Sequence, residues 1–186
     1  ALDISVDISV VVPLFCEASF FDYLFKRLEA VLTRLGCTYE IVCVDDGSYA
    51  DTIVGLREHR ARNPNIKIVA LSRNFGKELA LTAGIDYASG AAVVPIAADL
   101  QDPPEVISDF LEKWREGYDV VYGIRMDRNS DTRGKRVTAG LFYRFFNKLA
   151  EREIPADVGD FRLMDRVVVD AVKSMPERNR FMKGIF

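Results

Sequence analysis

Acidic side chains follow three of the apolar segments of this sequence. They are Glu17, Asp46 and Asp99, and each comes just after a run of apolar residues typical of a buried strand. Because the carboxyl ends of parallel strands meet at one edge of a sheet, we expect these carboxylates to lie close together. Neighbouring carboxylates repel one another unless a cation or hydrogen-bond donors hold them. The sequence therefore predicts an acidic binding site at one sheet edge.

A basic segment follows the last of these apolar runs. Residues 125–136 carry five cations and two acids, a local charge of +3 in a chain of net charge −3. Such segments are commonly solvated surface loops. Arg125, however, comes directly at the carboxyl end of an expected strand, and planar guanidinium groups bind phosphate well. The segment is therefore open to two interpretations, a solvated loop or a phosphate site.

The elements that position these residues alternate regularly. Strand-like runs at 8–15, 39–44, 66–71, 91–98 and 119–124 are separated by segments with helical spacing of apolar residues. Four such crossovers predict a mostly parallel sheet that is covered on both faces. Ser19 and Ser48, each with an aspartate three residues later, are expected to cap the first two helices.

The last third of the chain departs from this rhythm. An aromatic-rich helix over 137–151, a short strand around 161–164 and a helix from about 165 are expected there. With no linker or repeat, the pattern predicts a single domain over residues 1–186, of class α/β, with an annex at its C-terminal end.

Composition excludes several classes of protein. The 186 residues carry 25 Lys+Arg and 28 Asp+Glu, and 49% are hydrophobic, as in a folded domain and unlike a disordered chain or a general nucleic-acid binder. The single histidine, His59, stands among charged residues on an expected solvated helix face, so no chemistry is assigned to it. The P-loop pattern and the G-x-G-x-x-G fingerprint are both absent. Each remaining motif, taken alone, also has a structural explanation, such as the turn that Asp46-Gly47 predicts.

The order of the motifs is similar to that of the family 2 glycosyltransferases with a GT-A fold, from about Ile8 to Phe186. The motifs are VVPLFCE, VDDGS, RNFGKE, ADLQDPPE, GIR, GDFRLMDR and PERNRFMKG. Within that family, the chain most resembles polyprenyl-phosphate glycosyltransferases such as bactoprenol glucosyltransferases and dolichyl-phosphate mannose synthases. The resemblance implies a Rossmann-like three-layer α/β/α fold with a mostly parallel central sheet. It also implies a donor half over about 1–125 and an acceptor half over about 126–186.

The resemblance implies a donor site for a nucleoside-diphosphate sugar, with UDP-glucose preferred. The residues assigned to the donor nucleotide are Pro13, Phe15, Glu17, Asp46, Gly76 and Lys77. Among them, Asp46 would accept a hydrogen bond from the base, and Lys77 would reach the phosphate or ribose. Asp99 and Gln101, on one side of an extended segment, would be oxygen ligands of one Mg²⁺ or Mn²⁺. That cation would neutralise the departing nucleoside diphosphate.

The acceptor implied by the resemblance is a polyprenyl phosphate. Arg125, Arg133 and Arg136 would bind its phosphate group, and an acceptor that is already ionised needs little help from a general base. The catalytic residues would be Asp99, Arg125 and Asp160, with the role of Asp160 left open between base, positioning group and turn residue. The expected reaction inverts the anomeric carbon at the cytoplasmic face of a membrane. Relatives continue into C-terminal transmembrane helices, so we expect this chain to be the catalytic part of a longer membrane-anchored protein.

The sequence departs from the family pattern at two positions. Ala97 stands where the family carries the first acid of the metal motif, so activity is expected to be reduced, and Cys16 replaces a usual Asn. Two alternatives stay open: transfer to a polysaccharide or protein hydroxyl, and a non-catalytic module that binds nucleotide sugars. The mixture of basic and apolar residues over 176–186 predicts contact with a membrane surface. No nucleic-acid partner is expected, and homo-oligomerisation is left open.

Overall fold

Six strands form one sheet in a computed structural model of the chain, which describes residues 6–124 and 158–175. In chain order they are β1 (Ile8–Leu14), β2 (Tyr39–Asp45), β3 (Ile66–Ala70), β4 (Ala92–Pro95), β5 (Val120–Ile124) and β6 (Val158–Asp165). Their order across the sheet is β3-β2-β1-β4-β6-β5. The pairs among β1, β2, β3 and β4 are parallel, whereas β6 is antiparallel to both of its neighbours. The mostly parallel α/β sheet that the sequence predicts is confirmed.

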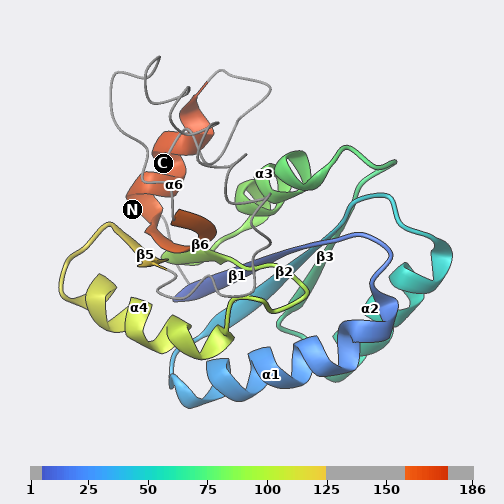
Figure 1. The fold of residues 1–186 in the computed structure, drawn as a ribbon, viewed down its shortest axis with the longest axis horizontal. Helices are drawn as coiled ribbons and strands as arrows, with labels where there is room; N and C mark the ends of the chain where they lie inside the picture. The colour runs from blue at the N-terminus through green and yellow to red at the C-terminus, as the bar shows by residue number, and fades with distance from the viewer. Residues whose placement is uncertain (1–5, 125–157, 176–186) are drawn as a thin grey trace, which may run out of the picture.

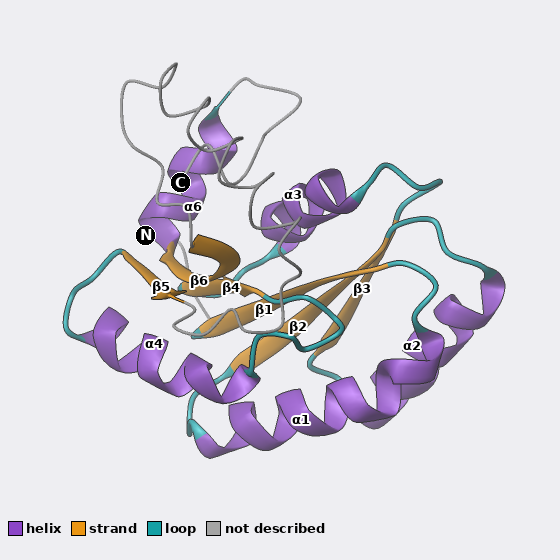
Figure 2. Ribbon diagram, viewed as in Figure 1, coloured by secondary structure: helices purple, strands orange, loops and turns teal. Residues whose placement is uncertain are grey.

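Helices cover both faces of the sheet, which gives the expected three layers (Figure 1). The helices are α1 (Phe21–Arg34), α2 (Ala50–Arg62), α3 (Lys77–Tyr87), α4 (Ile107–Arg115) and α6 (Arg166–Ser174), with short 3₁₀ turns η1 (Ala18–Phe20) and η2 (Pro104–Val106). Figure 2 shows α1, α2 and α4 on one face and α3 and α6 on the other. Within the described ranges, no helix combines the length and apolar character needed to cross a membrane.

The buried strands pack side chains into two cores, one on each face. Val10 and Val12 of β1 point into the core with α1 and α4, whereas Val11 points into the core with α3 and α6. Helix α3 comes unusually close to the sheet at Gly84, where an added Cβ would lie 2.3 Å from Cγ1 of Val11. This close approach fixes α3, and therefore its N-terminal end, against β1.

The two predicted serine caps are wrong. Helix α1 begins at Phe21 after the η1 turn, and no side chain caps it. Helix α2 also has no side-chain cap, because the Ser48 hydroxyl instead accepts a hydrogen bond from the backbone N–H of Cys16, at 2.8 Å. A cross-strand partner thus replaces the local cap that the capping-box pattern predicts, and it ties the end of β1 to the end of β2.

A buried polar cluster lies at the amino-end edge of the sheet, near the starts of β1 and β2. The Glu40 carboxylate accepts hydrogen bonds from the Ser9 hydroxyl (2.5 Å) and the Ser89 backbone N–H (2.7 Å), and it pairs with Lys67. Burial alone would raise the pKa of Glu40, but these donors together outweigh burial and lower it. Since Glu40 and Ser9 lie near the amino ends of β2 and β1, the cluster is separate from the carboxyl edge.

Two cations dock α6 onto the end of α3. The Arg166 guanidinium donates to the backbone carbonyls of Ala88 and Gly90, and the Lys173 ammonium donates to the carbonyl of Asp86, at 2.9 Å. Carbonyls at a helix C-terminus lack partners within the helix, so these cations satisfy them and complement the helix dipole. The last described helix is thereby fastened to the end of α3.

Candidate functional site

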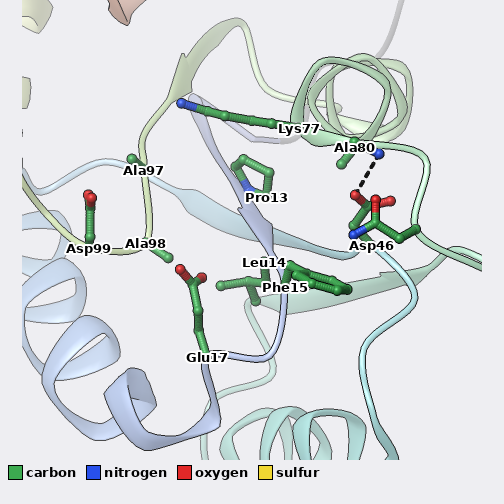
Figure 3. Close-up of a pocket in the computed structure, with 12 residues that line it drawn as sticks. Pro13, Leu14, Phe15, Glu17, Asp46, Lys77, Ala80, Ala97, Ala98 and Asp99 are labelled. Atoms are coloured by element: carbon green, nitrogen blue, oxygen red, sulfur yellow. Dashed lines mark hydrogen bonds between the residues drawn. The ribbon is translucent and has the colours of Figure 1, made fainter. Parts of the chain in front are cut away.

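A cavity of about 340 Å³ lies at the carboxyl edge of the sheet, between the end of β1 and the start of α3 (Figure 3). The six residues that sequence analysis assigns to a donor nucleotide all line it: Pro13, Phe15, Glu17, Asp46, Gly76 and Lys77. Ala97 and Asp99 also line it, from the segment after β4. The structure thus brings the predicted donor residues and the predicted metal ligand Asp99 to one cavity.

The end of β1 forms one wall of the cavity. Phe15 is 48% exposed there, so an aromatic face is open to a ligand. Cys16 next to it has the left-handed backbone angle φ 57°. Burial raises the pKa of the Glu17 carboxyl, and the negative charge of Asp99 raises it further. In Figure 3 the Glu17 carboxylate points toward Ala98 and Asp99.

Asp46 lines the cavity and is almost completely buried. Its Oδ1 accepts a hydrogen bond from the backbone N–H of Phe75 at 2.7 Å, and its Oδ2 accepts one from Gly76 at 2.9 Å. Its own backbone N–H donates to the carbonyl of Leu14 at 2.9 Å. Asp46 therefore links three segments, the ends of β1 and β2 and the loop before α3.

Lys77 is the one basic residue among the described residues that line the cavity. It is the first residue of α3, and its side chain extends across the cavity toward Ala97 (Figure 3). The N-terminal end of a helix favours anions, because its N–H groups carry partial positive charge. This wall of the cavity therefore suits a phosphate group, in contrast with the acidic wall formed by Glu17 and Asp99.

The segment after β4 differs from the extended one predicted from the sequence. Strand β4 ends at Pro95, and residues 97–100 form a turn in which the Leu100 N–H donates to the Ala97 carbonyl at 3.1 Å. Leu100 takes the left-handed angle φ 49°. The prediction that Asp99 and Gln101 share one side of an extended segment is therefore wrong. Asp99 lines the cavity, whereas Gln101 is exposed and is not among its lining residues.

The described residues fit a hard divalent cation in ligand type but supply few ligands. Asp99 offers a carboxylate and Gln101 an amide oxygen, which are the ligand types that Mg²⁺ and Mn²⁺ prefer. Within the described ranges, no group of three or more His, Cys, Asp and Glu side chains lies close enough together to hold a metal ion.

The predicted acceptor residues fall largely outside the described part of the chain. Arg125, Arg133 and Arg136 lie in the undescribed range 125–157. The backbone of Asp160 lies in β6, whose first residue Val158 pairs with Ile124 at the end of β5. Because β6 is antiparallel to β4, which is parallel to β1, the backbone of Asp160 lies near the same edge of the sheet as the cavity.

Sequence analysis assigned no role to Gly47, which lies against the loop that precedes α3. An added Cβ at this position would lie 2.2 Å from the backbone carbonyl carbon of Arg73, and Gly47 has φ 70°. Two requirements thus select glycine here, the left-handed backbone and the close approach of another segment. The Asp-Gly pair signals the turn, but nothing in the sequence signals its contact with Arg73.

Comparison of the sequence with known proteins identifies relatives along almost the whole chain. The family model described as "Glycosyl transferase family 2" matches residues 9–173. An uncharacterized glycosyltransferase of Synechocystis is 54% identical over 98% of this chain and 57% of its own length. A bactoprenol glucosyl transferase of Shigella phage SfV is 46% identical over 96% of this chain and 58% of its own length. The chain thus spans less than two thirds of these curated relatives.

Solved structures share the fold at low sequence identity. A mannosyltransferase of Pyrobaculum calidifontis, in complex with GDP-Man and Mn²⁺, has a TM-score of 0.63 at 20% identity and covers 95% of this chain and 51% of its own. TarS of S. aureus, residues 1–349, has a TM-score of 0.59 at 16% identity and covers 96% of this chain and 53% of its own. The expected GT-A fold is confirmed.

Proposed function

Because the chain belongs to glycosyl transferase family 2, we propose that it transfers a hexose from a nucleoside-diphosphate sugar to a polyprenyl phosphate. The observation that carries the proposal is a cavity, among the described residues, that combines an exposed aromatic side chain, three acidic side chains and a lysine at the carboxyl edge of the sheet. Relatives that are named bactoprenol glucosyl transferases support glucose as the sugar and a lipid phosphate as the acceptor.

The nucleoside of the donor would lie on the β1 wall. The exposed ring of Phe15 offers a face on which a base can stack, with Pro13 beside it. Glu17 would accept hydrogen bonds from ribose hydroxyls, and Asp46 would accept a hydrogen bond from the base. Uracil is our preferred base, which makes UDP-glucose the proposed donor.

The diphosphate of the donor would lie near the start of α3. Lys77 extends across the cavity there, and the helix N-terminus adds partial positive charge. A cation held by Asp99, with Gln101 as a further oxygen ligand, would neutralise the negative charge that develops on the leaving diphosphate. We propose Mg²⁺ or Mn²⁺ in this role, with the diphosphate completing the ligand set.

The acceptor phosphate would bind to Arg125, Arg133 and Arg136. An ionised phosphate oxygen can attack the anomeric carbon directly, in a single displacement that inverts it and breaks the bond to the diphosphate. Most of the acceleration would then come from orientation and electrostatics. Asp99 and Arg125 would act at the two sides of the reacting carbon, and Asp160 would serve as an additional positioning group or base.

The cellular setting follows from the acceptor. A polyprenyl phosphate resides in a membrane, so we propose that the chain works at a membrane surface, on the cytoplasmic side where nucleotide sugars are available. Residues 1–125 would form the donor half of one catalytic domain and residues 126–186 the acceptor half. We propose no nucleic-acid partner.

One observation favours a second function. At position 97 the cavity wall carries a methyl group, so Asp99 is the only carboxylate in this turn. A single carboxylate holds a divalent cation weakly, so the chain could bind the donor without turning it over. Such behaviour is that of a nucleotide-sugar-binding module. A third candidate, transfer to a polysaccharide or protein hydroxyl, would require a general base and would leave Arg125 and Arg136 without a role.

Calorimetry with UDP-glucose, with and without Mn²⁺, separates these candidates when it is combined with a product assay. If the chain is a transferase, we expect saturable donor binding that Mn²⁺ strengthens. UDP should then form when polyprenyl phosphate is added. Tight binding without UDP formation supports the module, whereas the absence of any nucleotide-sugar binding contradicts both. A thermal-shift screen of UDP-, GDP- and other nucleotide sugars identifies the base, because a bound ligand raises the unfolding temperature.

A further inference from the structure

We propose that Asp46 and Gly47 act as a latch that fixes the loop 73–76 and thereby aims Lys77 at the diphosphate of the donor. The inference rests on the proposed donor site and assigns Asp46 a positioning role in addition to its proposed contact with the base. We call residues 46 and 47 the latch and residues 73–76 the loop.

The carboxylate of Asp46 is already engaged on both oxygens. Oδ1 accepts from the N–H of Phe75 at 2.7 Å, and Oδ2 accepts from the N–H of Gly76 at 2.9 Å. Asp46 is only 4% exposed. Hydrogen bonds to a buried carboxylate are stronger than those between neutral groups, so the two bonds hold the loop in one position.

Gly47 adds a steric contact to these two hydrogen bonds. The absent Cβ leaves the space that the backbone of Arg73 and Asn74 occupies, since a Cβ would lie 2.2 Å from the Arg73 carbonyl carbon and 2.5 Å from the Asn74 nitrogen. The latch therefore contacts both ends of the loop, through Gly47 at Arg73 and through Asp46 at Phe75 and Gly76.

The loop leads directly into the helix that carries Lys77. Gly76 is the N-cap of α3, and its carbonyl accepts the first helical hydrogen bonds, from Leu79 (3.1 Å) and Ala80 (3.0 Å). The N–H of this same residue is held by Asp46. A fixed N-cap fixes the direction of the first helical side chain, Lys77, which extends toward Ala97 across the cavity. Pre-ordering of this cation lowers the entropy cost of binding a phosphate.

Hydrogen–deuterium exchange of the ligand-free protein tests the latch itself. In Asp46→Asn one acceptor oxygen becomes an amide donor that faces a backbone N–H, so one of the two bonds is lost. We expect exchange of the amides of Phe75 and Gly76 to accelerate on the order of tenfold or more, with little change in β1. Asp99→Asn removes an acid from the same cavity without touching the loop, and it should leave these amides unchanged. Unchanged exchange in Asp46→Asn overturns the latch.

Gly47→Ala provides a second variant in which the Asp46 carboxylate is intact. The added methyl group must displace the loop at Arg73, so exchange in the loop should rise as in Asp46→Asn. If Asp46→Asn fails to fold, Gly47→Ala still decides the question, because wild-type exchange rates in the loop would overturn the latch.

Binding of UDP and of uridine then tests whether the latch serves Lys77. A misplaced Lys77 affects only the ligand with phosphates, so Gly47→Ala should weaken UDP on the order of tenfold and uridine by less than about twofold. Lys77→Ala should have the same selective effect, and combining it with Gly47→Ala should add little, because the two act through one group. Equal losses for UDP and uridine would overturn the link to Lys77.

Failure of the latch and failure of the proposed donor give different results. If the wild-type protein binds neither UDP nor uridine, the donor assignment is contradicted, and the exchange experiment still decides whether the latch exists. If UDP binds but the variants lose it without any change in exchange, the donor assignment stands and the latch is overturned.

Discussion

The Oδ2 atom of Asp46 lies 2.9 Å from the backbone nitrogen of Gly76, so the residue that follows β2 holds the residue that precedes α3. The end of β2 and the start of α3 are joined in this way at the wall of one cavity. The same region connects to β1 through the Ser48 hydroxyl and the Cys16 N–H. The candidate site is therefore built from segments that stabilise one another, which is the arrangement that precise ligand positioning requires.

Ala97→Asp should strengthen donor binding in the presence of Mn²⁺. A second carboxylate beside Asp99 gives a divalent cation another oxygen ligand, and we expect a gain on the order of tenfold in UDP-glucose affinity, about 1.4 kcal/mol. Calorimetry with and without Mn²⁺ measures it. Ala97→Asn, which has the same shape without the charge, is the matched control. Equal affinities for the Asp and Asn variants would mean that position 97 does not serve a cation.

Arg125→Ala should impair use of the acceptor far more than binding of the donor. Loss of a guanidinium–phosphate contact is expected to raise the KM for polyprenyl phosphate on the order of tenfold or more, with the Kd for UDP-glucose nearly unchanged. Arg128→Ala, in the same basic segment and without an assigned role, is the control. A parallel loss of donor and acceptor affinity in Arg125→Ala would contradict the assignment.

Glu17→Gln should stabilise the fold at neutral pH while it weakens donor binding. Burial raises the pKa of Glu17, so the folded state binds this proton more tightly than the unfolded state does. The ionised carboxylate therefore destabilises the fold above the raised pKa, and the penalty disappears as pH falls through it. Urea unfolding at pH 7 should show a gain for Glu17→Gln that is absent near pH 4.

Glu105→Gln should change the free energy of unfolding in the opposite direction, so this variant is the comparison for Glu17→Gln. The hydrogen bond and charge of Arg27 lower the pKa of Glu105. Its ionised form stabilises the fold above the ordinary pKa, and this contribution is lost as pH falls, so the variant should lose a little stability at pH 7. A gain of stability for Glu105→Gln, or a loss for Glu17→Gln, would contradict the assignment of these two groups.

Glu40→Gln should destabilise the protein without changing its substrate affinities. The cluster with Ser9, Ser89 and Lys67 lies at the amino edge of the sheet, away from the cavity. Removing the charge that these donors surround should cost about 1–3 kcal/mol of unfolding free energy. The donors lower the pKa of Glu40, so the loss should be full at pH 7 and shrink in acid as the wild-type carboxylate is protonated. An altered UDP-glucose Kd would contradict the separation of the two edges.

The alternation of apolar runs predicts the strands and helices of residues 8–124 well, because buried parallel strands and one-faced helices leave strong periodic signals. It also places Phe15, Asp46 and Asp99 correctly at one edge, since topology alone carries the ends of parallel strands together. Rules based on neighbouring residues, such as the capping box, fail where a side chain or backbone contacts a segment that is distant in the sequence. Ser48 binds the backbone of Cys16 instead of capping α2, and Gly47 is required by the loop at Arg73.

The position of β6 in the sheet is a second feature that the sequence pattern does not predict. The run 161–164 predicts a strand, but only tertiary pairing places it antiparallel between β4 and β5. The turn at Ala97–Leu100 is likewise unpredictable from alternation, because Leu100 adopts a left-handed angle that no pattern signals for a leucine.

The most direct measurement of the proposed activity follows labelled glucose from UDP-glucose, in the presence of Mn²⁺, into a short-chain polyprenyl phosphate. The account predicts a polyprenyl glucosyl phosphate of inverted anomeric configuration, which NMR would identify. One UDP should be released for each molecule formed, and little label should enter polysaccharide or protein. Label that enters a hydroxyl acceptor while the lipid stays unmodified would contradict it, as would donor binding with no release of UDP.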